Sequence, residues 1–178
     1  MDELLKIEPS FNKEMFITKV NNIFIMLHTS IMTNNLNRVR HFISNDLESK
    51  YETILEDLNN RKLRQMYDEL NVKSTQIQNI EIVDNKIIIN VLLISRYMDY
   101  LVNKDTGEFV SGINDRRIEK NNYLVFEKII GNNYNGVIRK CPNCGASIDV
   151  NNSGQCKYCH SIFDTENHDW VLTSIKEY

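Results

Sequence analysis

Apolar residues in the first third of the chain recur at the three- and four-residue steps of an amphipathic helix. Over residues 11–33 one helical face carries Phe16, Val20, Ile23, Phe24, Leu27 and Ile31. A short second helix is predicted in LNRVRHFI (36–43). Asp46 is placed to cap a third helix, whose buried stripe runs from Leu47 to Leu63. The first part of the chain is therefore predicted to be helical.

From residue 74 the pattern changes to the two-residue alternation of β-strands. QIQNIEIV (76–83) and KIIINVLLISRYMDYLV (86–102) flank a short DNK turn, an arrangement typical of a hairpin. FVSGINDRRI (109–118) and YLVFEKII (123–130) extend the sheet. Because the strands follow the helices and pair antiparallel, we expect an α+β fold with N-terminal helices packed on a curved antiparallel sheet.

The second strand of this hairpin is apolar on both of its faces. One face carries Ile87, Ile89, Val91, Leu93, Ser95, Tyr97 and Asp99, and the other carries Ile88, Asn90, Leu92, Ile94, Arg96, Met98 and Tyr100. A strand of this kind needs cover on both faces. We expect helices on one face, and the C-terminal segment or a partner subunit on the other.

Charge and composition disfavour nucleic-acid-binding, secreted and membrane-spanning proteins. The chain has 178 residues, of which 42% are hydrophobic and 25% charged, as in a folded domain with a small appendage. Its net charge of -3 gives no basic field for nucleic acid. The N-terminus lacks the layout of a signal peptide, and no apolar stretch reaches the roughly 20 residues that span a bilayer. We therefore expect a cytoplasmic protein.

All the cysteines lie in two C-x-x-C pairs, Cys141/Cys144 and Cys156/Cys159. Each pair can present two thiolates from one tight turn, and four thiolates form the tetrahedral site that zinc prefers. Gly145 can adopt the positive φ that such a turn needs after its second ligand. The SIDVNNSGQ segment between the pairs resembles a short hairpin.

The ligand count indicates a structural zinc site. Four thiolates close the coordination shell, whereas a catalytic zinc keeps one position open. His160, next to the last cysteine, is therefore expected outside the ligand set. We predict a zinc ribbon over residues 139–178, following a main domain over residues 1–138. From residue 139 onward the chain has four cations and five anions, which disfavours nucleic-acid binding by the ribbon.

The segments SRYMDYLVNKDTGEFVSG (95–112), CPNCGA (141–146) and DWVL (169–172) carry a resemblance to a known family. The chain resembles bacterial proteins with the C-terminal domain of mitochondrial import inner-membrane translocase subunit 44, some of which carry a C-terminal zinc ribbon. The resemblance implies a cone-like fold similar to nuclear transport factor 2 and binding of a protein segment or a peripheral membrane surface. Because the chain begins at this domain, import-motor function is not expected. Ser30-Ile31 also departs from the Ala-Trp typical of the family.

The favoured function is a non-catalytic binding module. A concave sheet surface would bind a protein segment, a lipid or a partner subunit, so we expect a protein partner or a homo-oligomer. Tyr97 and Asp99 are candidate binding residues on the sheet. Trp170 is a candidate docking residue, or alternatively fills a small core within the ribbon.

Two alternatives remain at this stage. The first is an isomerase- or dehydratase-like enzyme in which an apolar pocket raises the pKa of Asp99, with Tyr97 beside it. In a simpler role Asp99 caps a turn or pairs with Arg116 or Arg117. The second alternative is nucleic-acid binding through the ribbon. A deep pocket with Asp99 at its floor would favour the enzyme.

Overall fold

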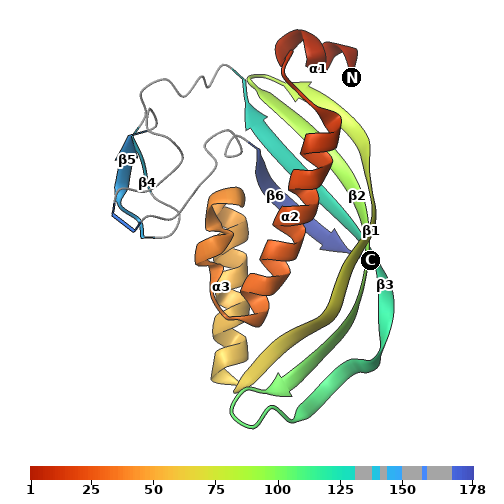
Figure 1. The fold of residues 1–178 in the computed structure, drawn as a ribbon, viewed down its shortest axis with the longest axis vertical. Coiled ribbons are helices and arrows are strands. Elements are labelled where there is room, and N and C mark those ends of the chain that lie inside the picture. Colours follow the sequence, from red (N-terminus) through yellow and green to blue (C-terminus); the bar gives the residue numbers. More distant parts are fainter. Residues whose placement is uncertain (131–137, 141–143, 150–157, 160–169) are drawn as a thin grey trace.

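The computed structural model describes residues 1–130, 138–140, 144–149, 158–159 and 170–178. In these residues, helices pack against the concave side of a curved antiparallel sheet (Figure 1). The helices are α1 (Asp2–Ile7), α2 (Lys13–Met32) and α3 (Asn45–Asn60). The sheet has the order β1-β2-β3-β6, from β1 (Leu63–Val83), β2 (Lys86–Asn103), β3 (Phe109–Ile129) and β6 (Val171–Glu177). The predicted α+β class and curved sheet are confirmed.

Local capping explains where the helices begin. The Asn12 side chain accepts a hydrogen bond from the Met15 backbone N–H at 2.9 Å, so α2 begins close to its predicted start. Ser44 caps α3 by accepting from the Leu47 N–H at 3.3 Å. The prediction that Asp46 is the cap was wrong, because Asp46 already lies in the first turn, where its charge interacts favourably with the helix dipole.

The link between the two long helices is tighter than predicted. LNRVRHFI forms two short 3₁₀ turns, Leu36–Arg38 and Arg40–Phe42, in place of a helix. His41 lies in the second turn and is half-buried. α1, which the periodicity did not reveal, buries only Leu4.

β1 begins eleven residues before the predicted change of pattern at residue 74. Its early part contains register shifts against β2 between Asp68 and Asn71 and between Val72 and Ser74. Each shift interrupts the two-residue alternation, and Glu69 adopts a positive φ of 53° in the first of them. The expectation that Leu63 ends a helical stripe was therefore wrong, because Leu63 opens this strand.

β2 is buried on the face that turns toward the helices. The six alternate residues of this face are at most 1% exposed: Ile87, Ile89, Val91, Leu93, Ser95 and Tyr97. α2 covers them with its own buried stripe, which includes Phe16, Val20 and Phe24. The predicted helix cover on this face is confirmed. The concave surface along this part of β2 is consequently filled by the protein's own helices.

β6 returns the chain to the main sheet after the cysteine segment. It pairs antiparallel with β3, and its Leu172 is fully buried opposite Phe126. The Leu172 carbonyl also accepts a hydrogen bond from the Ser44 N–H at 2.9 Å. The predicted ribbon unit, residues 139–178, thus contains one strand of the main sheet. Its cysteines lie in a connection between two neighbouring strands.

If β6 is an integral part of the core, Leu172→Ala should lower the free energy of unfolding by about 2–5 kcal/mol, because it leaves a cavity at a fully buried site. Lys176→Ala, at an exposed position of the same strand, should change it by less than about 0.5 kcal/mol. Urea unfolding of both variants measures the difference. Equal effects would show that β6 does not contribute to the core.

Candidate functional site

Four polar side chains from three strands meet on the concave side of the sheet. We call Tyr97, Asp99, Lys120 and Glu177 the inner polar cluster. Tyr97 and Asp99 lie two residues apart on β2, and strand pairing places Lys120 opposite Ser95 and next to the C-terminal end of β6. The structure thus brings the two candidate residues of the sheet together.

Hydrogen bonds and ion pairs connect this cluster. The Tyr97 hydroxyl donates to Glu177 Oε2 at 2.6 Å. The Lys120 ammonium forms an ion pair with Glu177, and its Nζ lies 3.4 Å from Asp99 Oδ2. The second oxygen of Asp99 accepts from Gln65 Nε2 at 2.8 Å. The cluster therefore links β1, β2, β3 and β6.

The charges of the cluster stabilise one another. Partial burial by itself would raise the pKa of Glu177, but the hydrogen bonds from Lys120 and Tyr97 and the Lys120 charge outweigh it and hold that pKa below its ordinary value. Burial by itself would lower the pKa of Lys120, yet Glu177 and Asp99 hold it above its ordinary value. Burial, and then the bond to Glu177, raises the pKa of Tyr97. At neutral pH the cluster holds a charged carboxylate–ammonium network with a neutral phenol.

Aromatic side chains pack against the inner polar cluster on the helix side. The His28 ring on α2 lies 4.7 Å from the ring of Tyr67 and 5.5 Å from that of Tyr97. Its Nδ1 is 2.9 Å from the Phe24 carbonyl, to which it donates. Burial lowers the pKa of His28, so the imidazole is neutral at pH 7. His28 is a core residue at 6% exposure.

The surroundings of Asp99 match neither the expected apolar pocket nor the expected pairing with Arg116 or Arg117. Asp99 pairs with Lys120, whereas Arg116 pairs with Asp115 and Arg117 pairs with Glu69. The bulge in β3 explains this difference: Tyr97 lies opposite Ile118 but Asp99 lies opposite Ile113. The arginines are therefore carried away from Asp99. Its side chain is 29% exposed among polar partners, and it does not lie at the floor of an apolar pocket.

The backbone beside Asp99 is held close by a glycine. Gly112, opposite Tyr100, has a φ of +107°. A Cβ at this position would lie 2.4 Å from the Asp99 carbonyl oxygen and 2.5 Å from the Tyr100 Cα, which no side chain tolerates. The glycine thus allows β3 to approach β2 where the bulge realigns the two strands.

Trp170 lies apart from the inner polar cluster. Its ring packs edge-on against Phe16 at 5.1 Å and Phe11 at 6.0 Å, and Lys128 Nζ lies 5.9 Å from its centre. At 6% exposure it is part of the core of the main domain. Trp170 therefore anchors the start of β6 on α2, and does not fill a separate small core.

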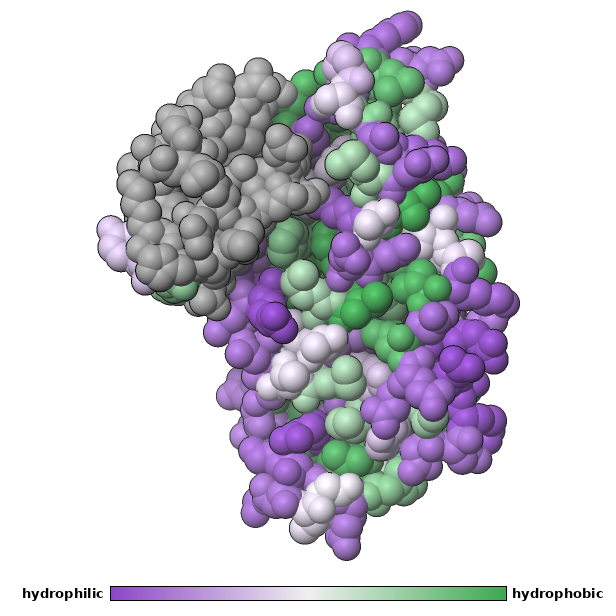
Figure 2. All heavy atoms as spheres, viewed as in Figure 1, coloured by the Kyte–Doolittle hydropathy of each residue, from purple (hydrophilic) through white to green (hydrophobic). Residues whose placement is uncertain are grey.

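The convex side of the sheet carries an apolar surface that α2 and α3 do not cover (Figure 1). We call it the outer apolar face. Its half-buried and exposed members are Ile88, Leu92 and Ile94 of β2, Tyr123 and Val125 of β3, and the C-terminal Tyr178. The rings of Tyr123 and Tyr178 pack edge-on, with centroids 5.5 Å apart. In the view of Figure 2, hydrophobic and hydrophilic side chains are mixed over the coloured part of the surface.

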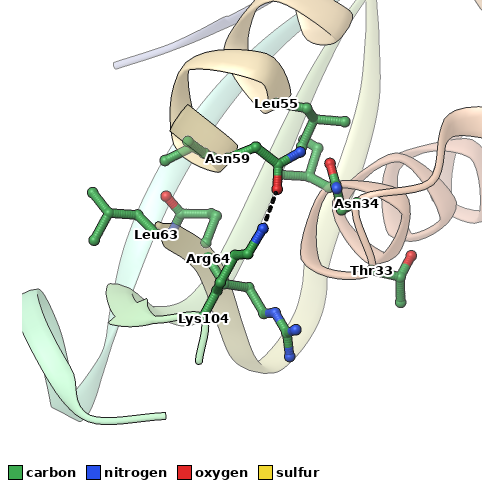
Figure 3. Close-up of a pocket in the computed structure, with 10 residues that line it drawn as sticks. Thr33, Asn34, Leu55, Asn59, Leu63, Arg64 and Lys104 are labelled. Atoms are coloured by element: carbon green, nitrogen blue, oxygen red, sulfur yellow. Dashed lines mark hydrogen bonds between the residues drawn. The ribbon is translucent and has the colours of Figure 1, made fainter. Parts of the chain in front are cut away.

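A cavity of about 190 Å³ opens where α2 and α3 end and β1 begins (Figure 3). Its ten lining residues are Ile31, Thr33, Asn34, Leu55, Leu58, Asn59, Leu63, Arg64, Gln65 and Lys104. Gln65, which donates a hydrogen bond to Asp99 of the inner polar cluster, lines the cavity, whereas Asp99 is not among these ten residues.

Comparison with known proteins gives the family. Residues 1–136 match the Tim44-like domain. The chain belongs to the Tim44-like domain family. No curated protein matches it in sequence. Tim44-like domains are binding and scaffold domains that mediate protein and membrane interactions, and they are not a known enzyme family. The family prediction from sequence is confirmed, whereas bacterial origin and the zinc ribbon remain predictions.

The cysteine segment of this Tim44-like protein is described only in part. Cys144 is exposed and Cys159 is half-buried, while Cys141, Cys156 and His160 lie outside the described residues. Within the described ranges, no group of three or more His, Cys, Asp or Glu side chains could hold a metal ion. β4 (Ile138–Lys140) and β5 (Ser147–Asp149) pair on either side of the first C-x-x-C. This pair is a different one from the hairpin predicted over residues 147–155, of which residues 150–155 lie outside the described part of the chain.

The described helices of this Tim44-like protein differ in length or hydropathy from a membrane-spanning helix. None of them combines the length and the apolar character that crossing a bilayer requires.

Several site residues could not be found from the sequence. Lys120, Glu177 and the adjoining Gln65 carry no local motif, and they meet Tyr97 and Asp99 only because four strands bring them together. The sequence pattern indicated only Tyr97 and Asp99 of this cluster, because they continue the apolar face of β2.

The depressed pKa of Glu177 makes this part of the fold sensitive to acid. A carboxylate whose pKa is lower in the folded state stabilises the fold above its unfolded pKa of about 4.5, and this contribution is lost as the pH falls through the folded pKa. Glu177→Gln should destabilise the protein at pH 7 by about 1 kcal/mol, since the lost charge-assisted bonds are partly screened by solvent.

Between pH 5 and pH 3, the variant should then lose less stability than the natural chain. Urea unfolding across this range measures both slopes, with Glu56→Gln, an exposed residue of α3, as the matched control. Parallel curves for all three proteins would contradict the assigned network.

Proposed function

We propose that this Tim44-like protein is a non-catalytic binding module whose outer apolar face docks a partner protein. One observation carries the proposal: β2 is apolar on both faces, and α2 covers only the inner one. A central strand that leaves Ile88, Leu92 and Ile94 half-exposed gains stability when a second surface removes them from water.

The convex side of the sheet, which includes the outer apolar face, is as a whole large enough for a stable interface. Strands of about 20 residues extend on the order of 60 Å, and three neighbouring strands are about 14 Å wide. Their face therefore covers roughly 800–900 Å², comparable to the 800 Å² that one partner contributes to an interface of standard size. The curvature of the sheet makes this face convex, which suits a concave or adaptable partner surface.

The charges on this face support a protein partner over a nucleic acid. Lys86 pairs with Glu127 and Lys73 pairs with Glu119, both at 2.9 Å, so these two positive side chains are neutralised, while Arg96 and Lys176 are also exposed on this side. The apolar residues stand between these pairs. A polar rim around an apolar centre is the usual arrangement of protein–protein interfaces.

We further propose that the four cysteines hold one structural zinc ion. The fit is supported by Gly145, which follows Cys144 with a φ of +73° and open space at its Cβ position, as a C-x-x-C turn requires. It is also supported by the β4–β5 pair, which brings the two ends of that turn together. In this arrangement Cys141, Cys144, Cys156 and Cys159 would supply four thiolates, and the zinc would stabilise the connection between β3 and β6.

Docking at the outer face predicts a specific loss of binding. Leu92→Gln together with Tyr123→Ser should reduce recovery of the native partner at least tenfold, because it places polar groups at the centre of the interface. Ile25→Gln, at a 41% exposed apolar position on α2, should leave recovery unchanged.

A photo-crosslinking residue at position 92, compared with one at position 25, provides the measurement in the source cells. The mass of the crosslinked product distinguishes a second copy of the chain from a different protein. Thermal melting confirms that both variants remain folded. Equal crosslinking at both positions, or unchanged recovery with the double variant, would contradict the proposal.

The zinc proposal predicts that Cys144→Ser loses the metal. A structural zinc contributes on the order of 10–16 kcal/mol to folding of the residues that hold it, so removing one thiolate should abolish retention. Elemental analysis of the purified protein should find one zinc per natural chain and none in the variant. His160→Ala should retain one zinc, and the main domain of Cys144→Ser should still melt cooperatively. Retention of one equivalent by Cys144→Ser would show that the four-cysteine assignment is wrong.

A further inference from the structure

The cavity at the ends of α2 and α3 has the size of a compact ligand. Its volume is about 190 Å³. A cavity of about 150 Å³ is known to hold benzene, whereas sites for drug-sized ligands begin at about 300 Å³. One aromatic ring, or an aliphatic group of similar size, is therefore the largest apolar group that fits well.

The lining divides into an apolar part and a polar rim. Ile31, Leu55, Leu58 and Leu63 supply the apolar part. The rim contains the cations Arg64 and Lys104 together with three amides and a hydroxyl, and no Asp or Glu among the described residues lines the cavity. This combination suits a ligand with an apolar body and a single negative group.

The rim retains unused hydrogen-bond donors. The Lys104 ammonium donates to Asn59 Oδ1 at 3.2 Å, which occupies one of its three donors (Figure 3). Within the part of the chain that the structure describes, neither Arg64 nor Lys104 forms an ion pair, and the Asn34 side chain makes no hydrogen bond. A guanidinium presents five donors in a planar fork that matches a carboxylate.

A structural explanation of the cations must also be considered. The C-terminal ends of α2 and α3 carry partial negative charge, which favours nearby cations. Lys104 serves this purpose through Asn59 in the last turn of α3. Arg64 makes no such contact with the described residues, so the helix ends account there for only one of the two cations.

We propose that this cavity binds a small monocarboxylate whose apolar part is about the size of one aromatic ring. Its carboxylate lies at Arg64 and Lys104, and its apolar part packs against Leu55, Leu58 and Leu63. The site goes beyond the proposed protein-binding function, because it lies on the helix side of the sheet and the outer apolar face lies on the other. It also adjoins the inner polar cluster through Gln65.

Benzoate and benzyl alcohol test the proposal, because they share a ring and differ in charge. We expect benzoate to produce saturable amide shifts in ¹H–¹⁵N spectra of the full chain, centred on Asn34, Asn59 and Lys104. Benzyl alcohol should bind at least tenfold more weakly, since it cannot use the cations.

Matched variants test whether Arg64 and Lys104 supply the charge that binds the carboxylate. Arg64→Gln and Lys104→Gln should each weaken benzoate binding about tenfold. Arg96→Gln, which removes an exposed arginine of β2 that does not line the cavity, should leave benzoate binding unchanged. The proposal is overturned by equal affinity for benzoate and benzyl alcohol, by an equal loss in Arg96→Gln, by shifts centred elsewhere, or by the absence of saturable binding at millimolar benzoate.

Discussion

The strict alternation of side chains along β2 is the constraint on which the rest of the structure depends. Its odd-numbered residues from Ile87 to Tyr97 are buried under α2, and its even-numbered residues are left on the convex side. A shift of one residue in register would exchange the two sets and expose the core. Because both sets are largely apolar, the same strand creates the core of the domain and the outer apolar face. The proposed binding surface is thus a direct consequence of how the core is built.

β6 closes this core from the far end of the sequence. Trp170 packs on Phe11 and Phe16 at its start, and Glu177 enters the inner polar cluster at its end. The cysteine segment is therefore held at both ends by the main sheet, through β3 and β6. A zinc ion in that segment would shorten the effective length of the connection and favour the return of β6. In the proposed arrangement the metal would support the fold.

The parts of the structure with regular periods were predictable, and those set by strand irregularities were not. α2 and the β1–β2 turn follow repeated patterns over many residues, and both were predicted. The start of β1 was missed because its bulges break the alternation. One expected role of Asp99, besides capping a turn, was to pair with Arg116 or Arg117, but the bulge between Ile113 and Ile118 moves these arginines away and Lys120 pairs with it. Glu177 meets Tyr97 across 80 residues of sequence, a distance at which local patterns carry no information.

The central claim is that the convex side of the sheet is the surface that this Tim44-like protein uses for binding. Hydroxyl-radical footprinting tests it most directly, by comparing the chain isolated with its native partner and the chain alone. The account predicts that Tyr123, which is 46% exposed in the single chain, is protected from oxidation in the complex, while Met15 on α2, at 66%, is oxidised equally in both. Protection of Met15 with unchanged oxidation of Tyr123 would contradict it.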